Sequence, residues 1–338
     1  MKVWRKYFFI ILGLAGITGL SLPSFAEEQA EASTRKAFQL VLDEDYAAAR
    51  EIVQPLAAAG EADAQHILAL LYEKGFGVEQ DMARALDLYA RSALQGQADS
   101  QFALGELAYS GAGGVAKDHE RAAGWYKLAA AGGHKGAQAR LGVLYAEGEA
   151  VKRDMSKAAA MFEDAAASGD AEAQYHLGAL FFTGEGVEQD LGLARDWFRR
   201  SAEQGHALAQ YNLAVLLDAD GSTSGEMVQW MRAAAQAGLP DAQVAMGLLT
   251  HDGRAGAKGE SPADWFEKAA NAGDPQGQFL YAVALSEGDG RRKNVKAARA
   301  LLEELLADKA NLRPELRRNA EALQEQLSKK GIGSFFRQ

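Results

Sequence analysis

One short pattern returns through most of this chain at nearly constant spacing. A small residue and a glutamine are followed, in most copies, by Leu-Gly or Leu-Ala, and the steps between successive glutamines are 36, 37, 36, 36, 33 and 35 residues. The repeated glutamines are Gln65, Gln101, Gln138, Gln174, Gln210, Gln243 and Gln278. Such a period is typical of repeat proteins in which each copy is one small supersecondary element.

Each copy predicts two helices. In the fourth copy Leu177, Leu180 and Phe181 fall three, six and seven places after the glutamine, which puts them on one face of a helix. A glycine about ten places after the glutamine, here Gly184, predicts the end of this first helix because glycine tolerates a left-handed cap. A short loop then leads to a second helix, and Gly205 closes the copy.

An acidic or amide residue recurs just before each second helix, in register with the repeat. Four repeated carboxylates could suggest acid–base catalysis, but aspartate and asparagine are also preferred N-caps, which accept hydrogen bonds from unpaired amides. The residues are Asp81, Asp118, Asp154, Asp190 and Asn294, each seven places before a bulky residue, namely Leu88, Trp125, Met161, Trp197 and Leu301. We interpret them as caps.

Stacking of the copies follows from their apolar faces. A lone helix pair cannot bury its apolar face, whereas stacked pairs bury the faces of one another. With 48% apolar residues and only 6 prolines, the sequence predicts an all-α fold, a right-handed superhelical solenoid of stacked helix–turn–helix repeats with first helices along a concave inner surface. The expected organisation is a degenerate helix pair over 27–59, about seven repeats over 60–308, and a capping helix with a loose tail over 309–338.

The fourth copy carries a family resemblance. Residues 173–178, residues 184–187, Asp190 and the pair Trp197 and Phe198 resemble the consensus of the Sel1-like repeats, relatives of the tetratricopeptide repeats. The resemblance extends over residues 60–308, although the fifth and sixth copies depart from it in their loops. It implies an exported bacterial scaffold or regulator that holds a protein or peptide, with envelope assembly, polysaccharide production and signalling as expected settings.

The first residues predict export. A basic start, an apolar run over residues 7–20, and Ser24 and Ala26 before a candidate cut at Glu27 together predict a signal peptide over 1–26. The alternative is an uncleaved anchor, which the short apolar run and Pro23 disfavour. We therefore expect a periplasmic or secreted protein with no stable membrane insertion after cleavage.

Charge and composition exclude several functions. The formal net charge is −10 and basic residues gather after residue 309, so the acidic body is a poor partner for nucleic acid. The absence of cysteine rules out disulfides and thiolate metal sites, and the paired cysteines of hydrolytic, β-lactamase-like members of the family are missing. A hydrolase and a secreted factor that binds host proteins remain the alternatives to a scaffold.

No constellation for chemistry stands out. The six histidines show no metal-binding spacing, and His134 and His206 simply follow the closing glycine of a copy. Alternating oxygens over residues 218–226 superficially suit calcium but lack the glycine and glutamate of a calcium loop. We predict no catalytic residue, no cofactor and no metal.

The remaining candidates lie at places one, five and eight after each glutamine, which we call the inner stripe. Tyr109 and Phe182 are favoured as partner contacts because aromatic residues at their place do not recur through the repeats. For the first-place aromatics the alternative is packing against the neighbouring copy. The predicted partner-binding residues are Tyr109, Phe182, Tyr175, Tyr211, Phe102 and Glu106.

Overall fold

The computed structural model describes residues 25–219, 225–256, 259–307 and 310–335, and every regular element in these ranges is a helix. The chain forms two compact units, with the boundary between His134 and Lys135. The predicted signal segment falls almost wholly within residues 1–24, outside the described residues. The same is true of Asp220, Ser222 and Ser224 in the loop with alternating oxygens.

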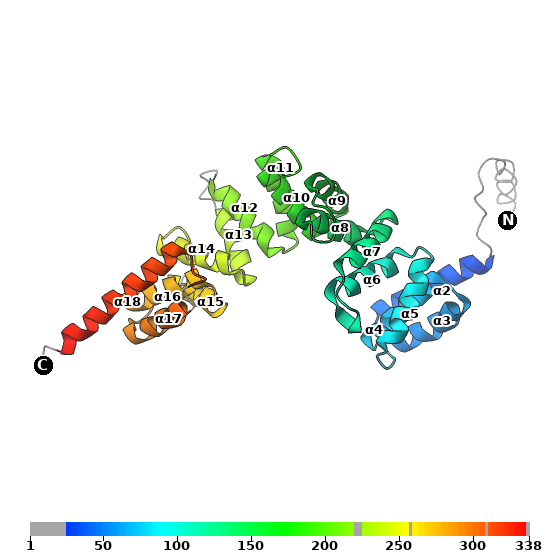
Figure 1. The fold of residues 1–338 in the computed structure, drawn as a ribbon, viewed down its shortest axis with the longest axis horizontal. Helices are drawn as coiled ribbons and strands as arrows, with labels where there is room; N and C mark the ends of the chain where they lie inside the picture. Colours follow the sequence, from blue (N-terminus) through cyan, green and yellow to red (C-terminus); the bar gives the residue numbers. More distant parts are fainter. Residues whose placement is uncertain (1–24, 220–224, 257–258, 308–309, 336–338) are drawn as a thin grey trace. The chain divides into compact units, whose positions relative to one another are not determined.

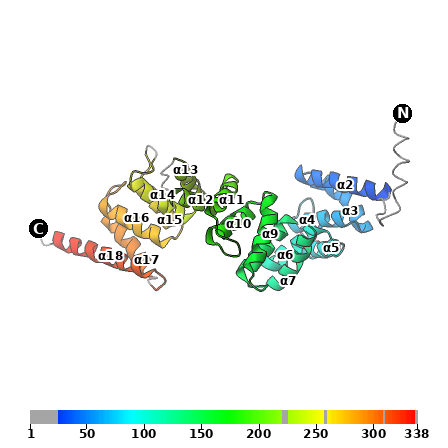
Figure 2. The ribbon, with the colours of Figure 1, turned by 90° about the horizontal axis from the view of Figure 1, so that it is seen from above.

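The first unit is a run of short helices in which each packs against the next (Figure 1). They are α2 (Phe25–Leu42), α3 (Tyr46–Ala59), α4 (Ala62–Lys74), α5 (Met82–Leu94), α6 (Ala98–Ser110), the 3₁₀ turn η1 (Ala112–Gly114) and α7 (His119–Ala131). In Figure 2, α2 lies along α3, and the two helices occupy the stretch for which the sequence predicted a degenerate helix pair.

Within the second unit the helices again pack as stacked pairs. Its helices are α8 (Lys135–Glu147), α9 (Met155–Ala167), α10 (Ala171–Thr183), α11 (Leu191–Glu203), α12 (Ala207–Ala219), α13 (Gly225–Gln236), α14 (Pro240–His251), α15 (Pro262–Asn271), α16 (Pro275–Glu287), α17 (Val295–Ala307) and α18 (Pro314–Phe335). The all-α fold of stacked helix–turn–helix repeats is thus confirmed. The fifth copy forms the pair α12 and α13 despite its divergent sequence.

The helix ends have the predicted chemistry. Gly184 takes a left-handed conformation with φ 76°, and the carboxylate of Asp190 accepts a hydrogen bond from the amide of Leu193 at 2.9 Å. The other repeated residues cap their helices in the same way, namely Asp81, Asp118, Asp154 and Asn294. In the sixth copy, which lacks the aspartate, Ser261 forms a reciprocal capping box with Asp264.

The most deeply buried large side chain of the second helix lies one place after the bulky residues that mark the register of the caps. Trp197 is half-buried, whereas Phe198 is 1% exposed. The same holds along the chain, where the almost fully buried residues are Tyr89, Tyr126, Phe162, Phe198 and Leu302. In these five pairs the residue eight places after the cap is therefore the large buried anchor.

A glycine in the first helix makes room for this buried ring. A Cβ atom on Gly178 would lie 2.7 Å from Cδ1 of Phe198, closer than carbon atoms can approach. The equivalent contacts are Gly105 with Tyr126, Gly142 with Phe162, and Gly247 with Phe266. In the fifth copy, where the anchor is Met231, alanine stands at this place as Ala214.

The repeated glutamine is a buried cross-link between helix pairs. The side-chain amide of Gln174 donates to the carbonyl of Ala166 at 3.2 Å, eight residues earlier and at the end of the preceding second helix. Gln65, Gln101, Gln210 and Gln243 repeat this bond. Gln138 differs, since its amide donates to the carboxylate of Asp164 at 3.4 Å.

The last helix is longer than expected. The sequence predicted a capping helix followed by a loose tail over 309–338, and α18 extends through most of this stretch, to Phe335. The glycines in this stretch cost only about 1 kcal/mol each in a helix, so helical hydrogen bonding can continue through them. Within the described residues, no helix combines the length and apolarity needed to cross a bilayer.

Candidate partner-binding surface

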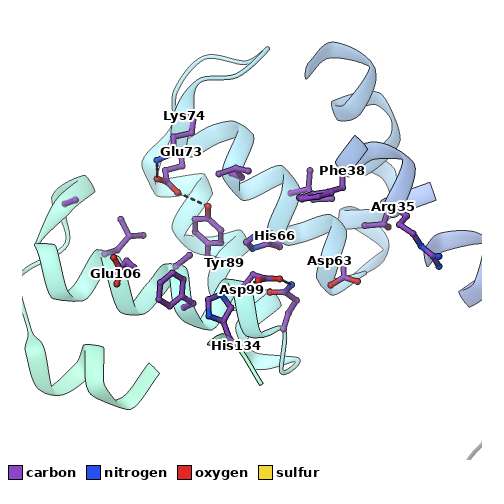
Figure 3. A pocket seen from close by; sticks show the side chains of 18 of the residues that line it. Arg35, Phe38, Asp63, His66, Glu73, Lys74, Tyr89, Asp99, Glu106 and His134 are labelled. Atoms are coloured by element: carbon purple, nitrogen blue, oxygen red, sulfur yellow. Dashed lines mark hydrogen bonds and ion pairs between the residues drawn. The ribbon is translucent and has the colours of Figure 1, made fainter. Parts of the chain in front are cut away.

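A cavity of about 770 Å³ opens in the first unit (Figure 3). Its lining comes mainly from α2, α4 and α6, together with Tyr89 of α5 and His134. The inner-stripe residues in the lining are His66, Leu70, Glu73, Phe102 and Glu106. Volumes of roughly 300–1,000 Å³ are typical of ligand pockets, so the stripe borders a space in which a ligand or several side chains can fit.

The cavity has an apolar floor and an acidic rim. Ile67 and Leu107 are buried in the fold yet form part of the lining, and Phe38 from α2 is 50% exposed beside them. Asp63 is exposed, and the side chain of Asp99 is 59% exposed. Apolar contact is therefore available deep in the cavity and negative charge at its edge.

Two tyrosines of the second helices hold acids of the first helices in place. The hydroxyl of Tyr89 donates to Oε2 of Glu73 at 2.7 Å, and the hydroxyl of Tyr126 donates to Oε1 of Glu106 at 2.6 Å. Burial raises the pKa of Tyr89, so this phenol remains a neutral donor at physiological pH. Each bond fixes the direction of a carboxylate that lines the cavity.

His66 lies at the centre of the lining (Figure 3). Its Nδ1 atom lies 2.9 Å from Oγ of Ser100, which in turn donates to Oγ of Ser92 at 2.8 Å. Burial lowers the pKa of His66 below its ordinary value, so the imidazole is mostly neutral at pH 7. The cavity therefore gains no positive charge from this residue.

Asp99 and His134 form a second polar pair at the rim. Nε2 of His134 lies 3.4 Å from Oδ1 of Asp99, and this hydrogen bond lowers the pKa of Asp99 to about 2. The ring of Phe102 stacks on His134 with ring centres 4.3 Å apart. Asp99 is therefore ionised at any physiological pH, beside an aromatic surface.

The predicted contact residues of the first unit divide into two groups. Phe102 and Glu106 both line the cavity. Tyr109 is half-buried and stacks on His119 with ring centres 4.6 Å apart, and it is not part of the lining. The structure brings the first two together at the cavity, whereas Tyr109 stacks on His119 outside it, and the role of Tyr109 in binding stays a prediction.

The other predicted contacts belong to the second unit. Phe182 in α10 is 41% exposed. Tyr175 stacks on His206 with ring centres 4.7 Å apart and packs against the core that contains Phe198, as does Tyr211. The first-place aromatics Tyr175 and Tyr211 thus show the packing that was the alternative for this position, while Phe182 leaves a large apolar surface open.

Sequence reasoning missed several lining residues. Phe38 and Arg35 lie on α2, where the repeat pattern has faded and gives no register. Asp63 and Asp99 lie two places before the repeated glutamine, a place that was not counted in the inner stripe. The sequence could have indicated these two acids, because an acid at the same place in two successive copies adds negative charge to the start of each first helix.

Solved structures contain the same fold. A Sel1 repeat protein from Oxalobacter formigenes aligns over 96% of this chain and 91% of its own, with 26% identity and a TM-score of 0.63. A protective antigen present in uropathogenic Escherichia coli strains, which displays an SLR fold, aligns over 90% of this chain and 85% of its own, with 23% identity and a TM-score of 0.58. Among curated proteins, none matches the sequence significantly.

Family membership follows from the sequence of the repeats themselves. The Sel1 repeat model matches residues 62–97, 98–134, 136–170, 171–206, 240–274 and 275–305. The unmatched stretch between 206 and 240 is the divergent fifth copy, which nonetheless folds as α12 and α13. The matched repeats cover more than half of the residues, and each of them folds as a pair of helices. The chain therefore belongs to the Sel1 repeat family.

Proposed function

We propose that this protein is a scaffold that holds a protein or peptide partner on the inner stripe of its first helices. The observation that carries the proposal is the cavity of the first unit, because five of its lining residues are inner-stripe residues of two successive copies. Sel1 repeat proteins are in general scaffolds for protein interactions, which agrees with a site made of apolar and charged side chains.

Exposed apolar residues of the second unit support the same function. Phe182, Val215 and Leu248 lie on the inner stripe of α10, α12 and α14, and each is about 40% exposed. Aromatic and large aliphatic side chains left accessible at repeated places suit anchors for a partner. The partner thus has possible anchor points on each unit.

Site-specific photocrosslinking tests this function. A photoreactive phenylalanine analogue at Phe102 or Phe182, in protein expressed in its native host, is expected to form adducts with a partner protein. The controls are Leu94 and Leu191, which are exposed apolar residues on or beside second helices. Adducts at both controls and at neither stripe position would contradict the proposal.

Export is a further part of the proposed function. The basic start, the apolar run and the small residues before Glu27 support removal of residues 1–26 and a periplasmic or secreted location. We expect intact-mass spectrometry of the protein from its native host to give a chain that begins at Glu27. A cell-envelope or secreted form that retains Met1 would contradict cleavage.

A further inference from the structure

The position of the ring hydrogen of His66, in the first-unit cavity, follows from its neighbours. The hydroxyl of Ser92 donates to the carbonyl of Ala62 at 2.7 Å, because a carbonyl oxygen can only accept. Since each hydroxyl has one hydrogen atom, the hydroxyl of Ser100 is the donor in its 2.8 Å bond to Ser92. Ser100 then has no hydrogen left for Nδ1 of His66 at 2.9 Å, so Nδ1 donates to Ser100.

The two serines therefore fix the tautomer of the imidazole. Burial lowers the pKa of His66, so the ring is mostly neutral at pH 7 and carries a single N–H group. With that hydrogen on Nδ1, Nε2 on the opposite edge of the ring has only a lone pair. Among the described residues Nε2 has no hydrogen-bond partner, and it is not one of their fully enclosed polar atoms, so this acceptor is open to the cavity.

Apolar surface lies beside this acceptor. Leu70 lies four places after His66, on the same face of α4, and both residues line the cavity. Figure 3 shows Phe38 of α2 on one side of His66 and Tyr89 of α5 on the other. The side chain of Phe38 is 50% exposed, so a flat apolar group in the cavity can lie against its ring. An acceptor among such side chains fits a ligand that is apolar apart from one hydrogen-bond donor.

The hydroxyl groups of the lining already donate within the protein. The hydroxyls of Thr34, Tyr89 and Ser110 each donate to a protein acceptor, at 2.9, 2.7 and 2.7 Å. A ligand oxygen that needs a donor therefore finds none among these three groups. The indole of tryptophan has one N–H donor, no acceptor and a flat apolar body, whereas the phenol of tyrosine brings an acceptor as well. The hydrogen bonding of the cavity thus matches an indole better than a phenol.

We propose that this cavity binds a tryptophan side chain of a partner peptide, with the indole N–H donated to Nε2 of His66 and the rings against the apolar floor. The proposal rests on the proposed scaffold function and names the side chain that the partner supplies. Charge complementarity between single atoms argues for this occupant, because the lone pair of Nε2 is negative and the indole N–H is positive. A partner that covers Nε2 without a donor leaves a buried acceptor unpaired and loses affinity.

Peptide binding to the purified protein tests the role of the indole N–H group. Short peptides are selected on the protein from a phage-displayed random library, and we expect the enriched peptides to contain tryptophan. One of them is then synthesised in two forms, the second with benzothienylalanine, in which sulfur replaces the N–H group and the ring size is kept. We expect the wild-type protein to bind the tryptophan form about tenfold more tightly, as measured by isothermal titration calorimetry.

Three variants separate the hydrogen bond from the apolar contact. His66→Phe keeps an aromatic ring but removes the acceptor, so the tenfold preference for the tryptophan form should disappear. Phe38→Ala should weaken binding of both forms about fivefold, because it removes apolar surface and leaves Nε2 in place. The control Leu94→Ala, at an exposed residue outside the lining, should bind both forms as the wild type does.

The comparison of the two peptide forms on the wild-type protein does not depend on any variant being folded. Equal affinity of the two forms would overturn the inference, and so would a preference that persists in His66→Phe shown to be folded by circular dichroism. The scaffold function would stand in both cases, since a peptide still binds. Enriched peptides without tryptophan, or a selection that enriches none, would also overturn the inference, whereas photocrosslinking at Phe102 and Phe182 decides the scaffold function independently.

Discussion

Phe198→Ala is expected to lower the free energy of unfolding by about 3–5 kcal/mol, the usual cost of removing a fully buried aromatic side chain. The ring is 1% exposed and lies against Gly178 of the paired first helix, where nothing else can fill the space. The neighbouring Trp197→Ala should cost less than Phe198→Ala, because more of that indole already contacts solvent, even though its contact with the guanidinium of Arg200 is lost as well.

Urea titration followed by far-ultraviolet circular dichroism measures both losses. The adjacent tryptophan is the matched control, since it is a larger aromatic residue on the same helix turn. A loss at Trp197 equal to or larger than that at Phe198 would place the anchor of the repeat at the wrong position and contradict the geometry described above.

Gly178→Val is expected to destabilise the protein by about 3 kcal/mol, at the upper end of the usual cost of overpacking a core. The Cβ atom alone would lie 2.7 Å from the ring of Phe198, and the two methyl groups would add further clashes. The ring and α10 must then move apart, which opens the packing of the helix pair.

Gly124→Val is the control for this change. Gly124 also lies inside a helix, α7, but a Cβ atom there would meet no atom within 4 Å. Any effect of valine on helix propensity is shared by both variants, so the difference between them reports the clash with the ring. Similar unfolding midpoints for the two variants would show that the ring does not require the glycine.

A compensating pair sharpens the test. Gly178→Ala/Phe198→Met recreates the combination that the fifth copy uses naturally, Ala214 with Met231. We expect this double variant to be more stable than the sum of its single changes predicts, because the flexible methionine can make room for the added methyl group. If the change in the free energy of unfolding of the double variant equals the sum of the two single changes, the two positions are not energetically coupled.

The sequence predicted those parts of the fold that depend on local chemistry. Asp190 was identified as a cap and Gly184 as a helix end because both roles are decided within a few residues of chain. The sequence marked Trp197 and Phe198 as a pair but did not say which ring is buried, since that depends on the exact rotation of one helix against another. Periodicity alone does not fix that rotation to a single residue.

The candidate site was predicted only in part for a similar reason. Phe102 and Glu106 were found because they share places with other copies, and both line the cavity. Tyr109 was chosen because aromatic residues do not recur at its place; it stacks on His119 at the start of the next helix and does not line the cavity, so its part in binding stays a prediction. Phe38 could not be found from the repeat at all, because α2 lies outside the register and meets the cavity only in the folded unit.

The buried glutamine has a consequence for how such a chain can change over evolutionary time. Gln174 is satisfied by the carbonyl of Ala166 and the side chain of Gln204, all within about one copy of the sequence. Because these hydrogen bonds join only neighbouring copies, they require that the neighbour has the common repeat pattern. They do not require one particular copy as the neighbour. Genes of this kind can therefore gain or lose whole copies by unequal recombination. At each new junction the repeated glutamine can form the same hydrogen bond to the end of the preceding second helix.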